Sequence, residues 1–377
     1  MDLADTEEEA AFRSRLRRWL GRALPGLPAP PAPDDWPGRR TYDTGWQRRL
    51  YDAGYGGLHW DAPPARRLIF LEETERAGAP YVGANFVGLL HAGPTIAAEG
   101  TDAQRERWLE PVLRGDEIWC QGFSEPGAGS DLAALRTSAV RDGDDYIVTG
   151  SKLWTSHAQV ADWCELLVRT DPGAPRHRGI SWLALPMDAP GVTVRPLRTL
   201  AGTDEFAEVF LDGVRVPVAN RVGAENDGWR VTMVTLSFER GTAFAGEVVA
   251  CRRDLERIAA AARAGGHWDD PALRSALGRL NAEFRALWRL IQWNASEARH
   301  TGGPPGAGAS VFKLRYSQAR QELYETAARV CGDAALDLDG AWTADRLSSL
   351  SYTIAAGTSQ IQRNIIAERI LGLPKGG

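Results

Sequence analysis

The hydrophobic periodicity of this 377-residue chain changes twice along its length, and these changes limit the folds that it can adopt. Apolar residues recur at helical spacing up to about Leu113. Short runs rich in β-branched and aromatic residues, bounded by turns, follow between about Cys120 and Arg221. Helical spacing returns from Asn226. The sequence therefore predicts a mostly α chain with a central β domain.

Boundaries placed at these changes divide the chain into three expected domains. A helical N-terminal domain covers residues 1–119, a small antiparallel β domain covers 120–222, and a C-terminal helical bundle covers 223–377. Such a chain is long for one hydrophobic core, so a division into two or three subdomains is expected.

Local signals support these elements. Thr6 and Glu9 form a capping-box pattern at the start of the first amphipathic helix. The sequence Asp-Gly-Asp at 142–144 predicts a hairpin turn between two strands. Asp270 is expected to cap a long helix that runs through Arg299.

Charge and composition exclude several classes of function. The chain has 44 basic and 49 acidic residues, a net charge of −5, which gives no electrostatic reason to expect nucleic acid. No window reaches a membrane-spanning length without charges, and the first residues lack the basic start of a signal peptide. The four cysteines show no metal-ligand spacing and suit a reducing compartment. We expect a cytoplasmic protein with no membrane contact and no metal site.

Two segments between Gln121 and Ser156 have the chemistry of a ligand site. In QGFSEPGAGSD the glycines let the backbone approach a flat ligand, and Ser124 and Ser130 supply hydroxyls. In SKLWTS the indole of Trp154 can cover a ring, and Ser156 lies two residues later, on the same side of a strand. Taken singly, the segments fit a surface turn and a core tryptophan better than they fit a ligand site.

Taken together, SEPGAGSD and KLWTS resemble the acyl-CoA dehydrogenase family, whose usual forms are TEPGAGSD and KxWITN. The segments RVPVANRVGAENDGW (215–229) and GTSQIQRNIIAERILGLP (357–374) are also similar to family segments, in the expected order. The resemblance covers nearly the whole chain. It implies the family fold, with a C-terminal four-helix bundle, and a noncovalently bound FAD.

The resemblance also implies a set of cofactor-binding residues. They are Gln121, Phe123, Ser124, Ser130, Trp154 and Ser156 on the flavin side, and Thr358 and Gln360 in the C-terminal motif. Ser130 is also expected to face the thioester or CoA. Two family motifs are degraded. R-x-Q-F-G, which in the family contributes to the flavin of a neighbouring subunit, is unrecognisable, with Arg274 as the best replacement for its arginine, and QxxGGxG is reduced to RVCGDAA. Asp333 in the latter places a charge where a pyrophosphate would approach.

The implied reaction is α,β-desaturation of an acyl thioester, in which a carboxylate removes the α proton and the β hydride passes to the flavin. Since the α C–H is weakly acidic, desolvation must raise the pKa of the base towards neutrality. Most family members carry this base just before the Gly-Thr of the C-terminal motif, where this chain has Ala356. One branch carries it on the first long helix of the C-terminal domain, just before an arginine.

The segment LSFERG matches that branch and implies Glu239 as the catalytic base. Arg240 would then hold the substrate or order the site, because its guanidinium stays charged. The alternative is that Glu239 is a helix-surface carboxylate paired with Arg240 or Arg263.

The resemblance implies oxidation of an acyl-CoA or acyl-carrier-protein substrate to its trans-2-enoyl form, with an electron-transferring flavoprotein as acceptor. A base on a helix hints at a branched, bulky or carrier-tethered acyl group. A homotetramer or heterotetramer is expected. The degraded motifs leave three alternatives open: one subunit of a heteromeric enzyme, a catalytically silent subunit, or a flavin oxidase or monooxygenase on the same scaffold.

Overall fold

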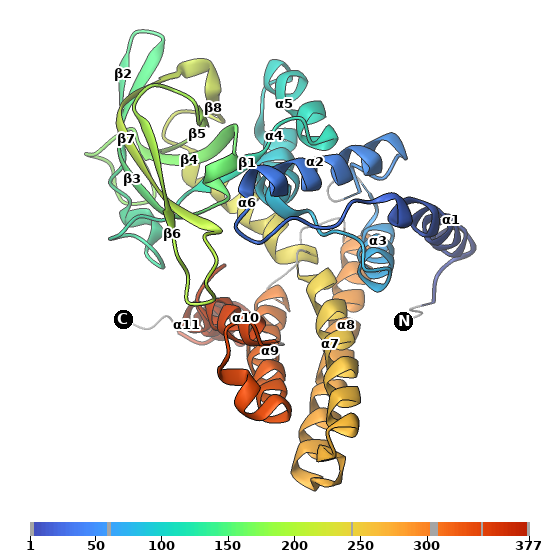
Figure 1. The fold of residues 1–377 in the computed structure, drawn as a ribbon. Helices are drawn as coiled ribbons and strands as arrows, with labels where there is room; N and C mark the ends of the chain where they lie inside the picture. Colours follow the sequence, from blue (N-terminus) through green and yellow to red (C-terminus); the bar gives the residue numbers. More distant parts are fainter. Residues whose placement is uncertain (1–3, 59–61, 243, 302–307, 341, 375–377) are drawn as a thin grey trace.

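The computed structural model describes residues 4–58, 62–242, 244–301, 308–340 and 342–374, and leaves the side chains of 239–242 and 297–301 outside the description. Helices at both ends of the chain flank a central sheet (Figure 1). The predicted fold class is therefore confirmed.

The N-terminal part is helical because its caps and apolar spacing agree. Its α-helices are α1 (Glu7–Ala23), α2 (Trp36–Asp52), α3 (Pro64–Arg76), α4 (Gly93–Glu99) and α5 (Asp102–Arg114), joined by the short helices η1 (Leu24–Gly26), η2 (Gly83–Asn85) and η3 (Gly88–Ala92). The predicted capping box of α1 is present, with the Thr6 side chain accepting from the Glu9 amide and the Glu9 side chain accepting from the Thr6 amide.

The central sheet has eight strands in a mixed arrangement. They are β1 (Trp119–Gly122), β2 (Ser138–Asp142), β3 (Asp145–Ser156), β4 (Trp163–Arg169), β5 (Ile180–Pro186), β6 (Val192–Leu197), β7 (Phe206–Pro217) and β8 (Arg221–Val222). Their order is β6-β7-β3-β2-β4-β5-β8, with β1 pairing with β4. The predicted turn at 142–144 joins β2 and β3, and Gly143 there has φ +63°.

The sheet departs from the purely antiparallel arrangement predicted from the sequence. β1 runs parallel to β4, and Ser138 of β2 also pairs in parallel with Arg169 of β4. A parallel pair needs a long connection, and the loop after β1 together with the β2–β3 hairpin provides it. The parallel pair brings Gln121 level with Glu165.

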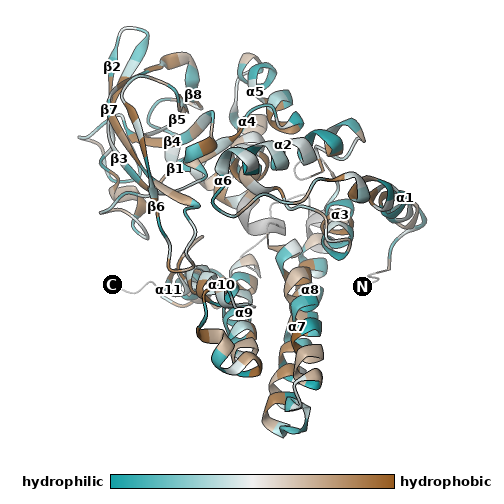
Figure 2. Cartoon of the chain, viewed as in Figure 1, coloured by the Kyte–Doolittle hydropathy of each residue, from teal (hydrophilic) through white to brown (hydrophobic). Residues whose placement is uncertain are grey.

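The C-terminal helices return to the amphipathic pattern. They are α6 (Gly228–Thr242), α7 (Ala245–Ala264), α8 (Pro271–Thr301), α9 (Gly308–Cys331), α10 (Thr343–Ser349) and α11 (Ser359–Ile365), with the shorter elements η7 (His267–Asp269), η8 (Gly332–Leu336), η9 (Leu350–Thr353) and η10 (Ile366–Ile370). The Asp270 carboxylate accepts from the Ala272 amide, as the predicted cap requires. Figure 1 shows α7 and α8 as a long hairpin that projects away from the sheet, and both alternate hydrophobic and hydrophilic patches in Figure 2.

The N-terminal domain shares a hydrophobic core with each of its neighbours. Leu16 and Leu20 of α1 belong to one cluster with Val248 of α7 and Phe284 of α8. A second cluster joins the N-terminal segment at 82–96 to the sheet through residues that include Val82, Leu89, Trp119 and Trp182. The segment from Ala79 to Ile96 therefore lies against both other domains.

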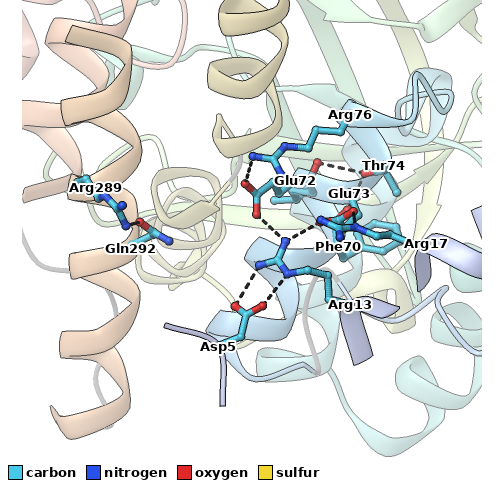
Figure 3. Close-up of polar contacts among 11 residues, drawn as sticks. Asp5, Arg13, Arg17, Phe70, Glu72, Glu73, Thr74, Arg76, Arg289 and Gln292 are labelled. Atoms are coloured by element: carbon cyan, nitrogen blue, oxygen red, sulfur yellow. Dashed lines mark hydrogen bonds and ion pairs between the residues drawn. The ribbon is translucent and has the colours of Figure 1, made fainter. Parts of the chain in front are cut away.

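An ion-pair network ties α1 to α3. The Arg13 guanidinium lies 2.6 Å from Glu73 and 2.7 Å from Glu72, and it also donates to Asp5 (Figure 3). Burial would raise the pKa of Glu73, but hydrogen bonds and charge from Arg17 and Arg13 outweigh it and hold that pKa below its ordinary value. The network stabilises the folded state while these carboxylates are ionised.

Replacing Arg13 with alanine is expected to lower the free energy of unfolding by about 3 kcal/mol at pH 7, because two poorly exposed carboxylates lose a shared partner. A depressed pKa stabilises the fold above the unfolded value and loses that effect as pH falls, so the deficit should shrink below about pH 4. Chemical denaturation at several pH values measures this.

Arg15→Ala is the control, since Arg15 is exposed on the same helix and should change the unfolding free energy by less than about 0.5 kcal/mol. Equal effects of the two substitutions would contradict a stabilising role for the network.

Candidate functional site

The loop after β1 forms a tight turn with an open side. Glu125 and Ala128 exchange two backbone hydrogen bonds of 3.0 Å, which fixes the turn. A Cβ built at Gly127 or Gly129 would meet no described atom within 4 Å. The backbone of the turn can therefore come close to a ligand. Such an approach would also bring the ligand within reach of the Ser124 and Ser130 hydroxyls, which lie on either side of the turn.

A buried ion pair joins this loop to β3. The Lys152 ammonium lies 2.8 Å from the Glu125 carboxylate and also donates to the Phe123 carbonyl at 3.2 Å. The same carboxylate accepts from the amides of Arg136 and Thr137 at 2.7 and 2.9 Å. Burial would raise the pKa of Glu125, but the charge and hydrogen bond of Lys152 hold it below its ordinary value. We call this arrangement the Lys152–Glu125 clamp.

The clamp was missed by sequence reasoning, although both residues lie inside the two quoted motifs. Leu153 also donates its amide to the Ser124 carbonyl at 2.9 Å, so the two motif segments are joined directly. Gln121, Phe123, Ser124 and Ser130 thus belong to one loop that is anchored beside Trp154 and Ser156. The structure brings these six predicted cofactor residues into one region.

Trp154 presents a large exposed ring at the end of β3. Its side chain is 57% exposed, its ring meets Phe206 edge-on at 5.9 Å, and its φ of 61° is unusual for a bulky residue. Thr155 beside it is buried, whereas Ser156 is partly exposed, so Trp154 and Ser156 share the more open side despite the bulge in the β3–β7 pairing. Strain of this kind, held by surrounding structure, is typical of ligand sites.

A buried polar trio lies behind the loop. The Gln121 amide donates to Glu165 at 2.7 Å and to Nδ1 of His91 at 2.9 Å, and His91 comes from η3 of the N-terminal domain. Both hydrogens of the amide nitrogen are thereby used, so the amide oxygen is turned away from Glu165. Sequence reasoning selected Gln121 but not its partners; the acidic residue within the apolar run of β4 was the available signal.

The two predicted contacts of the C-terminal motif, Thr358 and Gln360, lie at the start of α11. The Thr358 side chain accepts from the Ile361 amide and caps α11, and Gln360 is exposed at the start of that helix. Arg274 is exposed in the first turns of α8, on the hairpin that projects away from the sheet (Figure 1). Within one chain, the structure does not bring Arg274 to the residues around the Lys152–Glu125 clamp.

The backbone of Glu239 and Arg240 lies in α6, and their side chains lie outside the described part of the structure. Thr235, one turn earlier, is fully buried and accepts a hydrogen bond of 2.9 Å from the Thr95 hydroxyl of α4. This bond fixes α6 against the N-terminal domain. The helix that carries the predicted base is thus anchored directly before Glu239.

The position just before Gly357 is held in a defined conformation. Ala356 has φ 54°, and the Lys313 ammonium donates to the carbonyls of Tyr352 and Gly357 at 2.9 and 2.7 Å. The segment is therefore fastened to α9 on both sides of Ala356.

No group of three or more histidine, cysteine or acidic residues suited to a metal ion occurs among the residues that the structure describes. Across the same residues, none of the helices combines the length and the apolar character needed to cross a bilayer.

Lys152→Met is expected to speed amide exchange at Arg136 and Thr137 by at least about tenfold, because Glu125 loses its counter-ion and the loop opens more often. Hydrogen–deuterium exchange with mass spectrometry measures this. Lys313→Met is the matched control: it removes another buried lysine and should loosen residues 352–357 instead. If both variants sped exchange equally at residues 136–137 and at 352–357, the clamp would not stabilise its own loop specifically.

Comparisons with known proteins agree with this geometry. Three family models cover the chain: the acyl-CoA dehydrogenase N-terminal domain at residues 6–116, the middle domain at 120–214 and the C-terminal domain at 226–371. The chain is 39% identical to "Acyl-CoA dehydrogenase IpdE1" of Mycobacterium tuberculosis over 390 residues, which cover 99% of each protein.

Two solved structures have the same fold over their whole length. The "Tcur3481-Tcur3483 steroid ACAD" is 30% identical with a TM-score of 0.85, and the match covers 100% of both chains. The ChsE4-ChsE5 complex from Mycobacterium tuberculosis is 34% identical with a TM-score of 0.81, again over 100% of both chains. The chain therefore belongs to the acyl-CoA dehydrogenase family of oxidoreductases.

Proposed function

We propose that this chain catalyses the FAD-dependent α,β-dehydrogenation of a bulky acyl thioester, carried by coenzyme A or by a carrier protein, to its trans-2-enoyl product. The observation that carries the proposal is the Lys152–Glu125 clamp, which joins the glycine-rich loop to the strand that presents Trp154. We also propose that the three domains cover residues 1–119, 120–222 and 223–377, and that the protein is cytoplasmic.

The residues around the clamp fit a flavin. The exposed indole of Trp154 offers an apolar face to a flat ring, and the open turn at Gly127 and Gly129 offers backbone amides. Ser124, Ser130 and Ser156 supply hydroxyls, and Phe123 and Gln121 complete the loop side, with Thr358 and Gln360 from the C-terminal motif. The family depends on FAD, which supplies a hydride acceptor for the substrate β carbon.

Glu239 removes the α proton in this proposal, and Arg240 helps to order the substrate. The pKa of a carboxylate rises towards neutrality only where water is excluded. The hydrogen bond to Thr235 holds the backbone of α6 against the N-terminal domain, and such packing helps to exclude water. Ala356 carries a methyl group where most relatives carry a glutamate, so the loop leaves more room for the acyl group. A larger space next to a base on the helix favours a bulky substrate.

We further propose that the chain is one subunit of a heterotetramer. Arg274 lies on a projecting hairpin, where it can contribute to a neighbouring subunit, and the exposed Asp333 of η8 would repel a pyrophosphate. A different subunit without this charge would complete the flavin site. Both similar solved structures, Tcur3481-Tcur3483 and the ChsE4-ChsE5 complex, are named for two gene products, which supports this assembly. An electron-transferring flavoprotein is the proposed electron acceptor; a homotetramer is the alternative.

Glu239→Gln is expected to slow flavin reduction by about 10³-fold, because a glutamine cannot accept the α proton. Anaerobic stopped-flow mixing with a steroid acyl-CoA, chosen because one similar solved structure is named as a steroid enzyme, measures the bleaching of flavin absorbance. Glu256→Gln is the control: it changes an exposed glutamate of α7 and should stay within about twofold of wild type. Undiminished bleaching by Glu239→Gln would remove the assignment.

A second substitution, which moves the carboxylate to the usual family position, strengthens the same test. Adding Ala356→Glu to Glu239→Gln should recover at least about tenfold in rate, since it restores a base at the usual family position. The positive φ of residue 356 adds little further strain, since the unfavourable contact comes from the Cβ that alanine already carries.

The chain expressed alone is expected to retain FAD poorly, and co-expression with a second acyl-CoA dehydrogenase chain from the same genome should yield a yellow complex. Absorbance per protomer and native mass spectrometry measure cofactor content and subunit composition. Full FAD occupancy in a homotetramer of this chain would contradict the heteromeric assembly while leaving the reaction untouched.

A further inference from the structure

The buried group of Gln121, Glu165 and His91 contains a carboxylate that no step of the proposed reaction uses; we call it the Gln121 trio. Glu165 is fully buried in the middle of the apolar strand β4. Its carboxylate accepts from the Gln121 amide at 2.7 Å, a length typical of a hydrogen bond to an ionised group. A carboxylate is costly to bury, and nothing in the packing of an apolar strand requires one.

The Gln121 trio fixes the direction of the amide. An ionised carboxylate can only accept, so the amide must present its nitrogen to Glu165. The second hydrogen goes to Nδ1 of His91 at 2.9 Å, and the same Nδ1 lies 3.4 Å from the Glu165 carboxylate. Oε1 of Gln121, the negative end of the amide, is therefore turned away from the carboxylate, and the side chain is partly exposed.

The N-terminal domain holds His91 in place. The His91 ring is buried and meets the Phe86 ring edge-on at 5.0 Å, and the His91 carbonyl accepts from the Thr95 hydroxyl at 2.7 Å. Both acceptors of the Gln121 nitrogen are thus fixed. A flip of the amide would place its oxygen against the Glu165 carboxylate, which costs a hydrogen bond and adds repulsion.

Gln121 points to the face of the sheet that meets the N-terminal domain. Successive residues of a strand point to opposite faces, and the face of Gly122 is filled: a Cβ built there would lie 2.8 Å from Sγ of Cys164 and from a methyl carbon of Leu166. Phe123, on the same face as Gln121, belongs to the core that the sheet shares with the N-terminal domain. The amide oxygen therefore lies on the face of β1 that carries His91, next to the loop that the clamp anchors.

The proposed reaction changes the charge of the ring that Gln121 is proposed to contact. The substrate loses a hydride, which brings two electrons and one proton to the flavin, so the reduced ring gains one negative charge. The negative end of an amide and a carboxylate behind it both disfavour that charge. Lys152 does not change this sign, because it pairs with Glu125. Replacing the Glu165 carboxylate by an amide removes one negative charge, whichever other groups contact it.

We propose that the Gln121 trio lowers the midpoint potential of the flavin, with Gln121 contacting the ring and with Glu165 and His91 as the residues that position its amide. The inference rests on the proposed function, because it takes Gln121 as a flavin contact. A lower potential makes reduction of the flavin by the acyl thioester less favourable. It makes the onward transfer of electrons to a flavoprotein acceptor more favourable.

Two variants that remove or move one charge test the proposal. The midpoint potential of the FAD-containing complex is measured by anaerobic titration against a reference dye. Glu165→Gln has nearly the same shape and should raise the potential by at least about 30 mV, which is a tenfold change in the relative affinity for reduced flavin. The double exchange Gln121→Glu with Glu165→Gln keeps the net charge and brings the carboxylate to the ring. Its potential should return to the wild-type value or fall below it.

Asp254→Asn is the control, because it also replaces a buried carboxylate, one that accepts from the Tyr324 hydroxyl in the helical bundle. It should change the relative affinity for reduced flavin by less than about threefold, or about 14 mV. A purely structural role of Glu165 predicts no such order of potentials. An unchanged potential in Glu165→Gln would overturn the proposal. If that variant failed to fold, a potential of the double exchange above the wild-type value would overturn it as well.

Bleaching by acyl thioesters, followed on the same complex, separates the two levels of inference. If no thioester bleaches the flavin but the potentials follow the expected order, the proposed reaction fails and the role of the Gln121 trio stands. Bleaching together with equal potentials in wild type and Glu165→Gln leaves the reaction standing and removes the role of the trio. A complex that binds no flavin would contradict both.

Discussion

The candidate site depends first on the buried ion pair between Lys152 and Glu125. Removing two charges from water is costly, and the pair is tolerated because each partner is fully engaged: the lysine with a carbonyl of the loop, the carboxylate with two loop amides. The ion pair joins two short segments, which the β2–β3 hairpin separates in sequence, into one rigid surface. Without it, the glycine-rich loop and the strand that presents Trp154 would keep the backbone hydrogen bond from Leu153 to Ser124 but lose the side-chain contacts that brace it.

The N-terminal domain completes the site by contacting both of its neighbours. His91 reaches the sheet and meets Gln121 and Glu165, whereas Thr95 binds α6 through Thr235. The two residues lie one helical turn apart in the chain, so a single segment contacts both the strand that carries Gln121 and the helix that carries Glu239. The proposed base on a helix requires such support, because the helix must keep a fixed position relative to the loop.

The sequence predicted the fold, and it selected two segments that the structure joins, because both inferences depend on local patterns. The capping box at Thr6 and the hairpin turn at 142–144 are local, and the joint motif needs only order along the chain. It could not predict the parallel pairing of β1 with β4, the partners of Gln121, or the Lys152–Glu125 clamp, since each joins residues that are well separated in sequence. Arg274 stays a prediction, because the resemblance implies that its motif serves the flavin of a neighbouring subunit, and a single chain cannot bring the two together.

Proton removal by Glu239 is the central claim, and it can be measured apart from the redox step. A 3-thia acyl thioester has sulfur in place of the β carbon, so it keeps an acidic α C–H and has no hydride to lose. We predict that the enzyme exchanges this α hydrogen with D₂O, as followed by mass spectrometry, and that Glu239→Gln slows the exchange by about 10³-fold. Exchange at the wild-type rate in Glu239→Gln would contradict the assignment of the base.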